Sequence, residues 1–262
     1  MLELISYVFG ASFFAMMLVG GYFFMGTKGS WLIQRKFYPE KSDNIYWIYK
    51  NAVLIWITDR QFIVWLILLG QYSKMVDAII SSINSNTKKG KKVLQIGCAF
   101  GNISKRIANE CKDSNLTIVD IIPNEIKRSR KKIKKAKIEN CAFLLEDATN
   151  LSHKDSFFDC VFLFFLFHEL PYQEKKESLK EAARVLEPKG KIIFSEFHKP
   201  EKKTLRILGW IFFRVFEPHA KEMWEDFNTT EVLNKETPFK WRISTRKYLF
   251  GNYQVTTAKK IH

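Results

Sequence analysis

Short apolar strands that alternate with helical patterns constrain the fold of this chain more than any other feature. The strands are expected at Val93–Ile96, Leu116–Val119, Cys160–Phe167 and Lys191–Phe194. Strands separated by helix-length segments form parallel sheets with helices on both faces. The sequence therefore predicts an α/β fold with a doubly wound, mostly parallel sheet, whose ligands bind at the carboxyl ends of the strands.

The first strand leads into a glycine-containing turn, VLQIGCAFGN. Gly97 and Gly101 allow the backbone to bend sharply and to approach a ligand, and the helix after them offers free backbone N–H groups. Many such turns carry an acidic residue and three glycines, whereas Gln95 and Ala99 stand in two of those places here. We interpret the turn as an altered cofactor site.

Acidic residues follow the next two apolar stretches. Asp120 ends LTIVD, where a carboxylate can accept hydrogen bonds from both hydroxyls of a ribose, and Asp147 lies in EDA after the third stretch. A solvated loop aspartate is the alternative for Asp120. The motifs SFFD and EAARVLEPKGKIIF come later in the same order.

These five ordered motifs, from Lys92 to Phe194, resemble those of the class I S-adenosylmethionine-dependent methyltransferases. The resemblance implies a Rossmann-like sheet of seven strands. It also implies that the glycine turn holds the methionine end of the cofactor, the acidic strand end holds the ribose, and the EDA segment reaches the adenine. The cofactor-binding residues implied in this way are Gln95, Gly97, Cys98, Phe100, Gly101, Asp120, Asp147 and Ala148.

A narrower resemblance covers residues 46–254. The segments VLQIGCAFGN, FFLFHELP, EFHKP, FEPHAKEMW and YLFGNYQ are similar to those of the RquA-like rhodoquinone biosynthesis proteins. That resemblance implies that a methoxy group of ubiquinone is replaced by an amino group. It further implies S-adenosylmethionine as the amino donor and a requirement for manganese.

Four polar residues follow two strands that are expected to be neighbours. His168 and Glu169 follow one strand, and Glu196 and His198 follow the other. Imidazole nitrogen and carboxylate oxygen suit a divalent ion such as manganese, so these four residues are the candidate metal ligands. His168, Glu169 and His198 are also the candidate catalytic residues, because they could instead move protons at a quinone ring. Ordinary hydrogen-bonded pocket residues are the third possibility.

A run without charged residues, Leu4–Met25, is long enough to cross a hydrocarbon core of about 30 Å as a helix. We expect residues 1–28 to be a single transmembrane anchor rather than a cleaved signal peptide. Basic residues follow the run, so the rest of the chain is expected on the cytoplasmic side, at the inner membrane if the protein is bacterial.

Two further regions follow the anchor in this interpretation. Residues 29–90 are expected to form an apolar helical cap or a membrane-interface region, with ordinary core helices as the alternative. Residues 91–262 are expected to form the cofactor-binding domain, with a lid insertion at 200–236.

The net charge of +15 favours an anionic binding partner. The run KRSRKKIKKAK at 127–137 is basic around most of its expected helix, which fits either a solvated surface or contact with anionic lipids. No aromatic residue is interleaved in it to stack on bases, so nucleic acid is not expected as a partner.

Together these features predict a membrane enzyme that converts ubiquinone, or another lipophilic quinone, to its amino derivative with S-adenosylmethionine. One alternative is a methyltransferase of a quinone or another membrane lipid, similar to UbiE. The other is a non-catalytic, membrane-tethered protein that binds S-adenosylmethionine.

Overall fold

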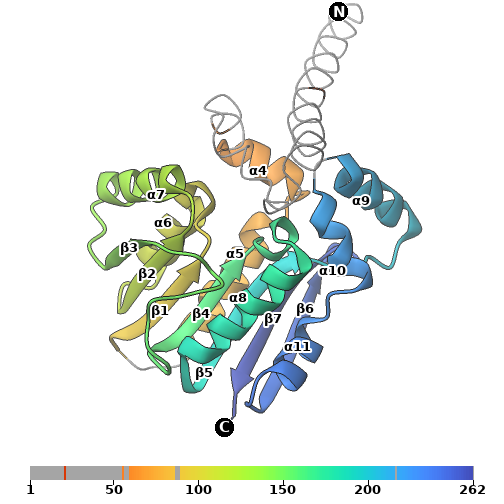
Figure 1. The fold of residues 1–262 in the computed structure, drawn as a ribbon. Coiled ribbons are helices and arrows are strands. Elements are labelled where there is room, and N and C mark those ends of the chain that lie inside the picture. The colour runs from red at the N-terminus through yellow and green to blue at the C-terminus, as the bar shows by residue number, and fades with distance from the viewer. Residues whose placement is uncertain (1–20, 22–54, 56–58, 86–88, 216, 262) are drawn as a thin grey trace, which may run out of the picture.

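A single seven-stranded sheet in the order β3-β2-β1-β4-β5-β7-β6 organises the described part of the chain (Figure 1). The computed structural model describes residues 21, 55, 59–85, 89–215 and 217–261. β7 pairs antiparallel with both β5 and β6, and the other pairs are parallel. The expected α/β fold is confirmed. The strands are β1 (Lys91–Ile96), β2 (Ser114–Asp120), β3 (Cys141–Leu145), β4 (Phe158–Phe164), β5 (Leu186–Phe197), β6 (Trp241–Tyr248) and β7 (Tyr253–Lys260).

Helices cover both faces of the sheet. Along the buried parallel strands, successive side chains point to opposite faces, so Val93 packs in one apolar cluster and Leu94 in the other. The first cluster includes side chains of α5, α6 and α7, and the second includes those of α8 and α11. The α-helices are α4 (Gln61–Ile67), α5 (Tyr72–Asn84), α6 (Asn102–Glu110), α7 (Pro123–Lys135), α8 (Tyr172–Val185), α9 (Lys203–Val215), α10 (Glu222–Glu225) and α11 (Thr229–Glu236).

The expected strand Cys160–Phe167 ends three residues early. Phe165 has a φ of 52°, which turns the chain out of the sheet, and residues Phe167–Glu169 form the short 3-10 helix η4. A residue with a side chain rarely adopts this conformation, so the sequence gives no signal for it. As a result His168 lies in a turn at the carboxyl edge of the sheet.

The two described helices of region 29–90 differ in burial. α5 buries one face against the sheet, with Met75, Val76 and Ile79 fully covered, and is therefore a core helix. α4 has no buried residue. Within the described residues no single helix is long and apolar enough to span a bilayer; α4 and α5 reach that length only together, across a 94° bend. Apart from Gly21, the expected anchor at 1–28 lies outside the described residues.

The segment between β5 and β6 contains α9, the 3-10 helix η5 (Pro218–Lys221), α10 and α11. After this segment, β6 and β7 pair as an antiparallel hairpin across the turn at Gly251. α9 packs inward through Phe213, whose ring meets those of Phe197 and Trp224 at centroid distances of 5.0 and 4.7 Å.

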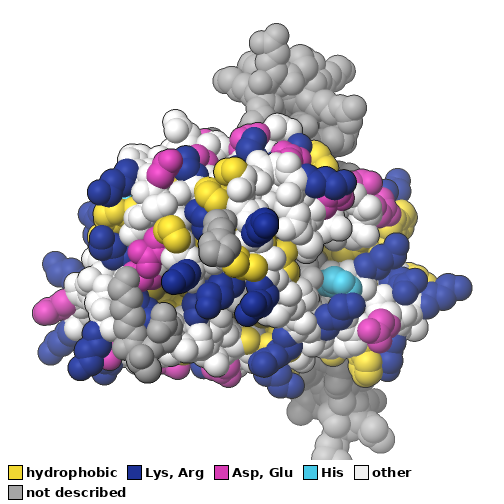
Figure 2. Space-filling model, turned by 90° about the horizontal axis from the view of Figure 1, so that it is seen from below, with side chains coloured by type: hydrophobic (Ala, Val, Ile, Leu, Met, Phe, Trp, Pro, Cys, Tyr) yellow, Lys and Arg dark blue, Asp and Glu magenta, His cyan; other side chains and the backbone are white. Residues whose placement is uncertain are grey.

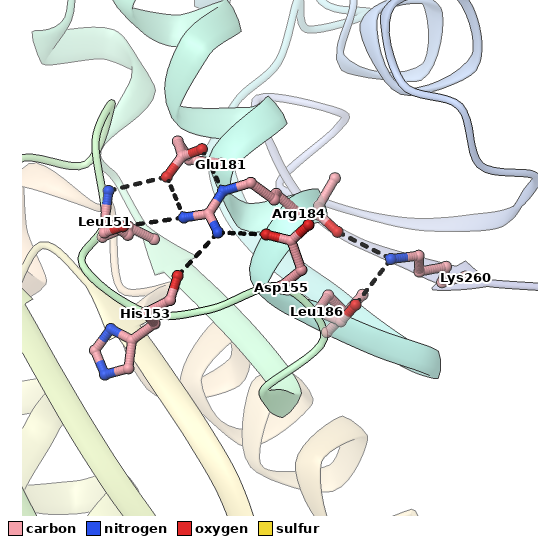
Figure 3. Close-up of polar contacts among 8 residues, drawn as sticks. Leu151, His153, Asp155, Glu181, Arg184, Leu186 and Lys260 are labelled. Atoms are coloured by element: carbon pink, nitrogen blue, oxygen red, sulfur yellow. Dashed lines mark hydrogen bonds and ion pairs between the residues drawn. The ribbon is translucent and has the colours of Figure 1, made fainter.

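Arg184, near the end of α8, holds the loop between β3 and β4 (Figure 3). Its guanidinium donates to the carbonyl oxygens of Leu151 and His153 and to the carboxylates of Asp155 and Glu181, at 2.7–3.0 Å. Glu181 in turn accepts the backbone N–H of Leu151 at 2.9 Å. This network fixes the loop that carries the EDA motif against α8.

Replacing Arg184 by methionine is expected to lower the free energy of unfolding by about 2 kcal/mol, because two carbonyls and two carboxylates lose their donor. Urea unfolding followed by circular dichroism measures the change. Lys180→Met is the matched control on the same helix, since Lys180 makes an exposed ion pair with Glu177 worth at most about 0.5 kcal/mol. Equal unfolding midpoints for the two variants would contradict this role.

Candidate functional site

A pocket opens at the carboxyl ends of β1, β2 and β4, where the sequence predicts the cofactor. Its wall is formed by the glycine turn, the end of β2, the loop after β3 and the bend after β4. Four of the predicted cofactor residues line it: Gly97, Asp120, Asp147 and Ala148. Glu146 of the EDA segment also lines the wall. The wall further includes residues that were not expected from the sequence: Glu125, Thr149, Leu166, Leu170 and Glu174.

Asp120 joins two parts of this wall. Its Oδ2 accepts the backbone N–H of Cys98 at 2.8 Å, and its Oδ1 accepts that of Ile122 at 2.9 Å. Burial raises the pKa of Asp120, and these backbone donors offset part of the rise. Each carboxylate oxygen keeps a second lone pair, so Asp120 can still accept hydrogen bonds from two vicinal hydroxyls.

Asp147 is more exposed and is held locally. Its Oδ1 accepts the N–H and the hydroxyl of Thr149, both at 2.8 Å, which forms an Asx turn at the rim of the pocket. Ala148 lies between them on the pocket wall. This arrangement leaves Oδ2 of Asp147 available to a donor such as an adenine amino group.

Gln95 and Cys98 lie behind the pocket rather than on its wall. Gln95 is fully buried in β1, its Nε2 donates to the carbonyl of Gly97 at 2.9 Å, and its Oε1 is buried without a hydrogen-bond partner among the described residues. Burial raises the pKa of the Cys98 thiol, so this side chain stays protonated, and both the thiol and the backbone N–H of Cys98 interact with Asp120. Phe100 lies in the 3-10 helix η3 (Ala99–Gly101), and its side chain is outside the described part.

Gly101 begins α6 with a φ of 76° and touches α7. A Cβ at this position would lie 2.4 Å from the Cα of Ser129, which is backbone and cannot move aside. Gly97 is less tight, since its Cβ would meet the flexible Leu166 side chain at 3.2 Å. The second glycine of the motif therefore brings α6 and α7 together, in addition to shaping the turn.

Gly101→Ala is expected to lower the free energy of unfolding by about 2 kcal/mol or more, since it combines a left-handed backbone with a steric clash. Gly90→Ala is the matched control. It has a φ of 68° but no atom within 4 Å of the added Cβ, so only the conformational cost of about 1 kcal/mol applies. Chemical denaturation compares the two, and a larger loss for Gly90→Ala would refute the packing role.

His168 and Glu196 form a buried pair beside the pocket. Nδ1 of His168 lies 3.1 Å from Oε1 of Glu196, and the backbone N–H groups of His168 and Phe197 also donate to this carboxylate. Burial alone would lower the pKa of His168, but the charge and hydrogen bond of Glu196 and the nearby Glu217 and Glu169 raise it to about 9. His168 is therefore an imidazolium at neutral pH.

Glu217, which was not assigned a role from the sequence, is the third member of this cluster. Its Oε2 is buried and has no hydrogen-bond partner among the described residues. Burial raises the pKa of Glu217, the charge of His168 opposes the rise, and Glu169 and Glu196 add to it. The cluster adjoins the pocket, because Phe165 and Glu169 line the pocket and Phe165 also contacts the His168 ring.

Lys175 holds the loop that carries Glu217. This lysine is fully buried in α8, and its Nζ donates to the carbonyl of His219 at 2.8 Å and to the carboxylate of Glu222. Burial lowers the pKa of Lys175, and its pairing with Glu222 opposes that shift. The two partners of Lys175 lie 44 and 47 residues further along the chain. Because a buried lysine needs such partners, this contact holds the loop against α8.

The described structure does not bring His168, Glu169, Glu196 and His198 together as one set of metal ligands, and metal ligation by them stays a prediction. The described residues contain no group of three or more histidine, cysteine or acidic side chains that could hold an ion. Glu196 already accepts three donors, and His198 points elsewhere, with Nδ1 2.7 Å from the carbonyl of Gly251. As they lie here, the four side chains do not form a donor set for manganese.

The stability of the protein is expected to decrease as pH rises because of this cluster. The pKa of His168 is higher in the folded chain, about 9, than its ordinary value of 6.5. Its contribution is therefore complete below about pH 6.5 and is lost as pH rises through about 9. Urea midpoints of the wild type should fall between pH 6.5 and 9.5 by more than those of a His168→Gln/Glu196→Gln double variant. Parallel curves would contradict the assignment.

A seven-stranded sheet of this order, with β7 antiparallel and a pocket at its carboxyl edge, is the fold of the class I methyltransferases. A methyltransferase from Aquifex aeolicus, described as dependent on S-adenosylmethionine, superposes with a TM-score of 0.57 at 17% identity, over 81% of this chain and 99% of that chain. The PH0226 protein from Pyrococcus horikoshii superposes with a TM-score of 0.56 at 23% identity, over 72% and 91%. At these identities the likeness shows the fold.

Sequence comparison finds a matching family and several relatives. Residues 93–190 match the family described as "Methyltransferase domain". An uncharacterized methyltransferase of Oceanobacillus iheyensis is 27% identical over 68% of this chain and 87% of its own length. The ubiquinone/menaquinone biosynthesis C-methyltransferase UbiE of Rickettsia bellii is 31% identical over 48% of this chain, which spans about half of that relative. These findings support the class I S-adenosylmethionine-dependent methyltransferase superfamily, with S-adenosylmethionine as cofactor; membership of the narrower RquA-like group is not established by them.

Proposed function

We propose that this protein transfers a methyl group from S-adenosylmethionine to the ring of a lipophilic quinone in its reduced, quinol form. The observation that carries the proposal is the placement of the buried His168–Glu196 pair beside the cofactor pocket, where Phe165 lines the pocket and contacts the His168 ring. The similarity to UbiE C-methyltransferases supports the same substrate class.

The residues present fit S-adenosylmethionine. Asp120 would accept the ribose hydroxyls, Asp147 would accept a donor from the adenine, and the turn at Gly97 would receive the methionine portion. When bound, the cofactor supplies an electrophilic methyl group. The free acceptor oxygens and the glycine backbone thus match the parts of this molecule that donate hydrogen bonds or need close approach.

The buried cluster would act on the acceptor ring. A quinol carbon becomes nucleophilic when a ring hydroxyl loses its proton, and the imidazolium of His168 would stabilise the resulting oxyanion. Glu217 has a raised pKa and an unpartnered oxygen, which suits a group that accepts this proton near neutral pH. Phe165 and Phe197 flank His168 and would contact the ring faces.

A second candidate is amino transfer, in which a methoxy group of ubiquinone is replaced by an amino group to give rhodoquinone. Gln95 favours it. An uncharged amide stands in β1 where many such turns have a carboxylate, and this removes one negative charge that would hold the amino group of the cofactor as an ammonium ion. An amine must be unprotonated to attack a ring. The poor fit of the cluster to manganese counts against this candidate.

Mass spectrometry of quinones separates the two reactions. Ubiquinone-producing cells express the full chain, or His168→Ala, and are fed methionine with a deuterated methyl group. For methyl transfer the host also lacks its own quinone C-methyltransferase, so that a quinone with an unsubstituted ring carbon accumulates. A labelled methyl on that carbon, absent without the protein, supports methyl transfer, and formation of S-adenosylhomocysteine by the purified protein agrees with it. Replacement of a methoxy by an amino group supports the second candidate. An unchanged quinone profile with folded protein present would overturn both.

A further inference from the structure

The described surface carries one concentration of exposed apolar side chains. Of the thirteen large hydrophobic side chains exposed in the described residues, ten lie on or beside α4 and α9 or in the β6–β7 turn. Phe62 and Leu208 are the most exposed of these, at 67% and 62%. We call this set the apolar face; its members are Phe62, Trp65, Leu66, Ile67, Leu69, Ile207, Leu208, Trp210, Ile211 and Phe250.

Packing of the fold does not require these side chains. α9 is attached through its opposite side, where Phe213 is 2% exposed and Gly209 lies close to the ring of Trp224. α4 is held at its end, where the carbonyl of Ile67 accepts the hydroxyl of Tyr253 at 3.3 Å. Clusters of this kind on a protein surface indicate a site of interaction.

Most of the charges on and beside the apolar face are basic, although the exposed Glu201 bonds the backbone of Phe250. α4 carries no charged residue, and α9 carries Lys203, Arg206 and Arg214 but no acidic residue. Lys202 lies over the Phe250 ring at 3.5 Å, and Arg214 lies over the Trp210 ring at 5.1 Å. Arg206 donates to the carbonyls of Pro200 and Glu201 rather than to a carboxylate. Tryptophans and cations around an apolar centre are typical of helices that lie in an anionic lipid interface.

The position of the apolar face agrees with contact to a lipid interface. Figure 1 shows α4 and α9 at the same end of the molecule, beyond the carboxyl ends of the parallel strands, where the pocket lies. Figure 2, viewed from below, shows a different surface: lysine and arginine side chains gather there, and hydrophobic side chains form small separate patches. The two ends of the sheet therefore differ in the surface that they offer.

We propose that α4, α9 and the β6–β7 turn lie in the interface of an anionic phospholipid bilayer, so that the pocket faces the membrane. A long-tailed substrate would then reach the pocket while its tail stays in lipid. The proposal goes beyond the proposed reaction and does not depend on it, because it concerns the orientation of the chain and is tested without turnover.

Spin labels can test the orientation in the full-length protein. Leu66→Cys and Leu208→Cys place a label on the apolar face. Asp113→Cys is the matched control, exposed at the opposite edge of the sheet beside Gly90. Cys141 is replaced by serine, since the other three cysteines are buried. The labelled proteins are reconstituted in vesicles of phosphatidylcholine with phosphatidylglycerol, and collision with oxygen and with a water-soluble nickel chelate is measured by electron paramagnetic resonance.

The labels at 66 and 208 are expected to collide with oxygen and to be shielded from nickel, while the label at 113 shows the reverse. Nickel access at 66 and 208 equal to that at 113 would place the face in water and overturn the proposal. Shielding from both reagents would also overturn it, because it would mean that protein, from a second copy or another part of the chain, covers the face. Neither result bears on the quinone reaction, which the mass spectrometry tests separately.

Discussion

Replacing His168 by glutamine is expected to reduce turnover by about 10²- to 10⁴-fold while the affinity for S-adenosylmethionine changes little. The imidazolium of His168 sits beside the pocket, paired with Glu196 at 3.1 Å, and glutamine supplies neither its charge nor its proton. The measurement is the rate of labelled methyl transfer to a quinol, with cofactor binding by calorimetry.

Loss of the fold must be separated from loss of chemistry in this variant, because Glu196 would be left buried without its cationic partner. The double variant His168→Gln/Glu196→Gln removes both charges and is expected to regain stability but not activity. His198→Gln is the matched control, since that imidazole bonds the carbonyl of Gly251 away from the cluster. Equal losses in His198→Gln and His168→Gln would show that His168 has no specific role in the reaction.

Replacing Asp120 by asparagine is expected to weaken S-adenosylmethionine binding by about 100-fold, or about 3 kcal/mol. Both oxygens of Asp120 accept backbone N–H groups, from Cys98 and Ile122. An asparagine amide can satisfy one of them and must direct its NH₂ at the other. The glycine turn and the loop after β2 would then separate, and the ribose would lose a charged acceptor.

Isothermal titration with S-adenosylmethionine measures this affinity, with circular dichroism to confirm folding. Asp113→Asn is the control, because its side chain is exposed at the far edge of the sheet. Wild-type affinity in Asp120→Asn would contradict the cofactor site as described.

The parts of this protein that the sequence predicts are those set by local pattern. The alternation of strands and helices predicted the sheet, and the position of Asp120 at the end of the second strand predicted it on the pocket wall. Neighbouring strand ends also brought His168 and Glu196 together as expected. Their interpretation as metal ligands did not consider what each residue does to the other: the charge and hydrogen bond of Glu196 raise the pKa of the His168 imidazole, against the effect of burial.

Other parts depend on contacts between distant segments. From the sequence, Lys175 is indistinguishable from the surface residues of a helix rich in lysine and glutamate. It is buried because the loop that carries Glu222 packs over it in the folded chain. Glu217 lies in FEPHAKEMW, one of the segments that carry the RquA-like resemblance. Its burial, however, depends on the same loop. No pattern within either helix or loop carries that information.

α8 holds two loops, one at each end. Lys175 in its second turn holds the loop of Glu217, and Arg184 in its last turn holds the loop of the EDA motif. An α-helix turns about 100° per residue and rises about 1.5 Å, so the number of residues between these two anchors sets both their direction and a spacing of about 14 Å. One residue more or fewer would turn one anchor away from its loop. The length of this helix therefore sets the position of the loop that carries the EDA motif relative to the loop that carries Glu217.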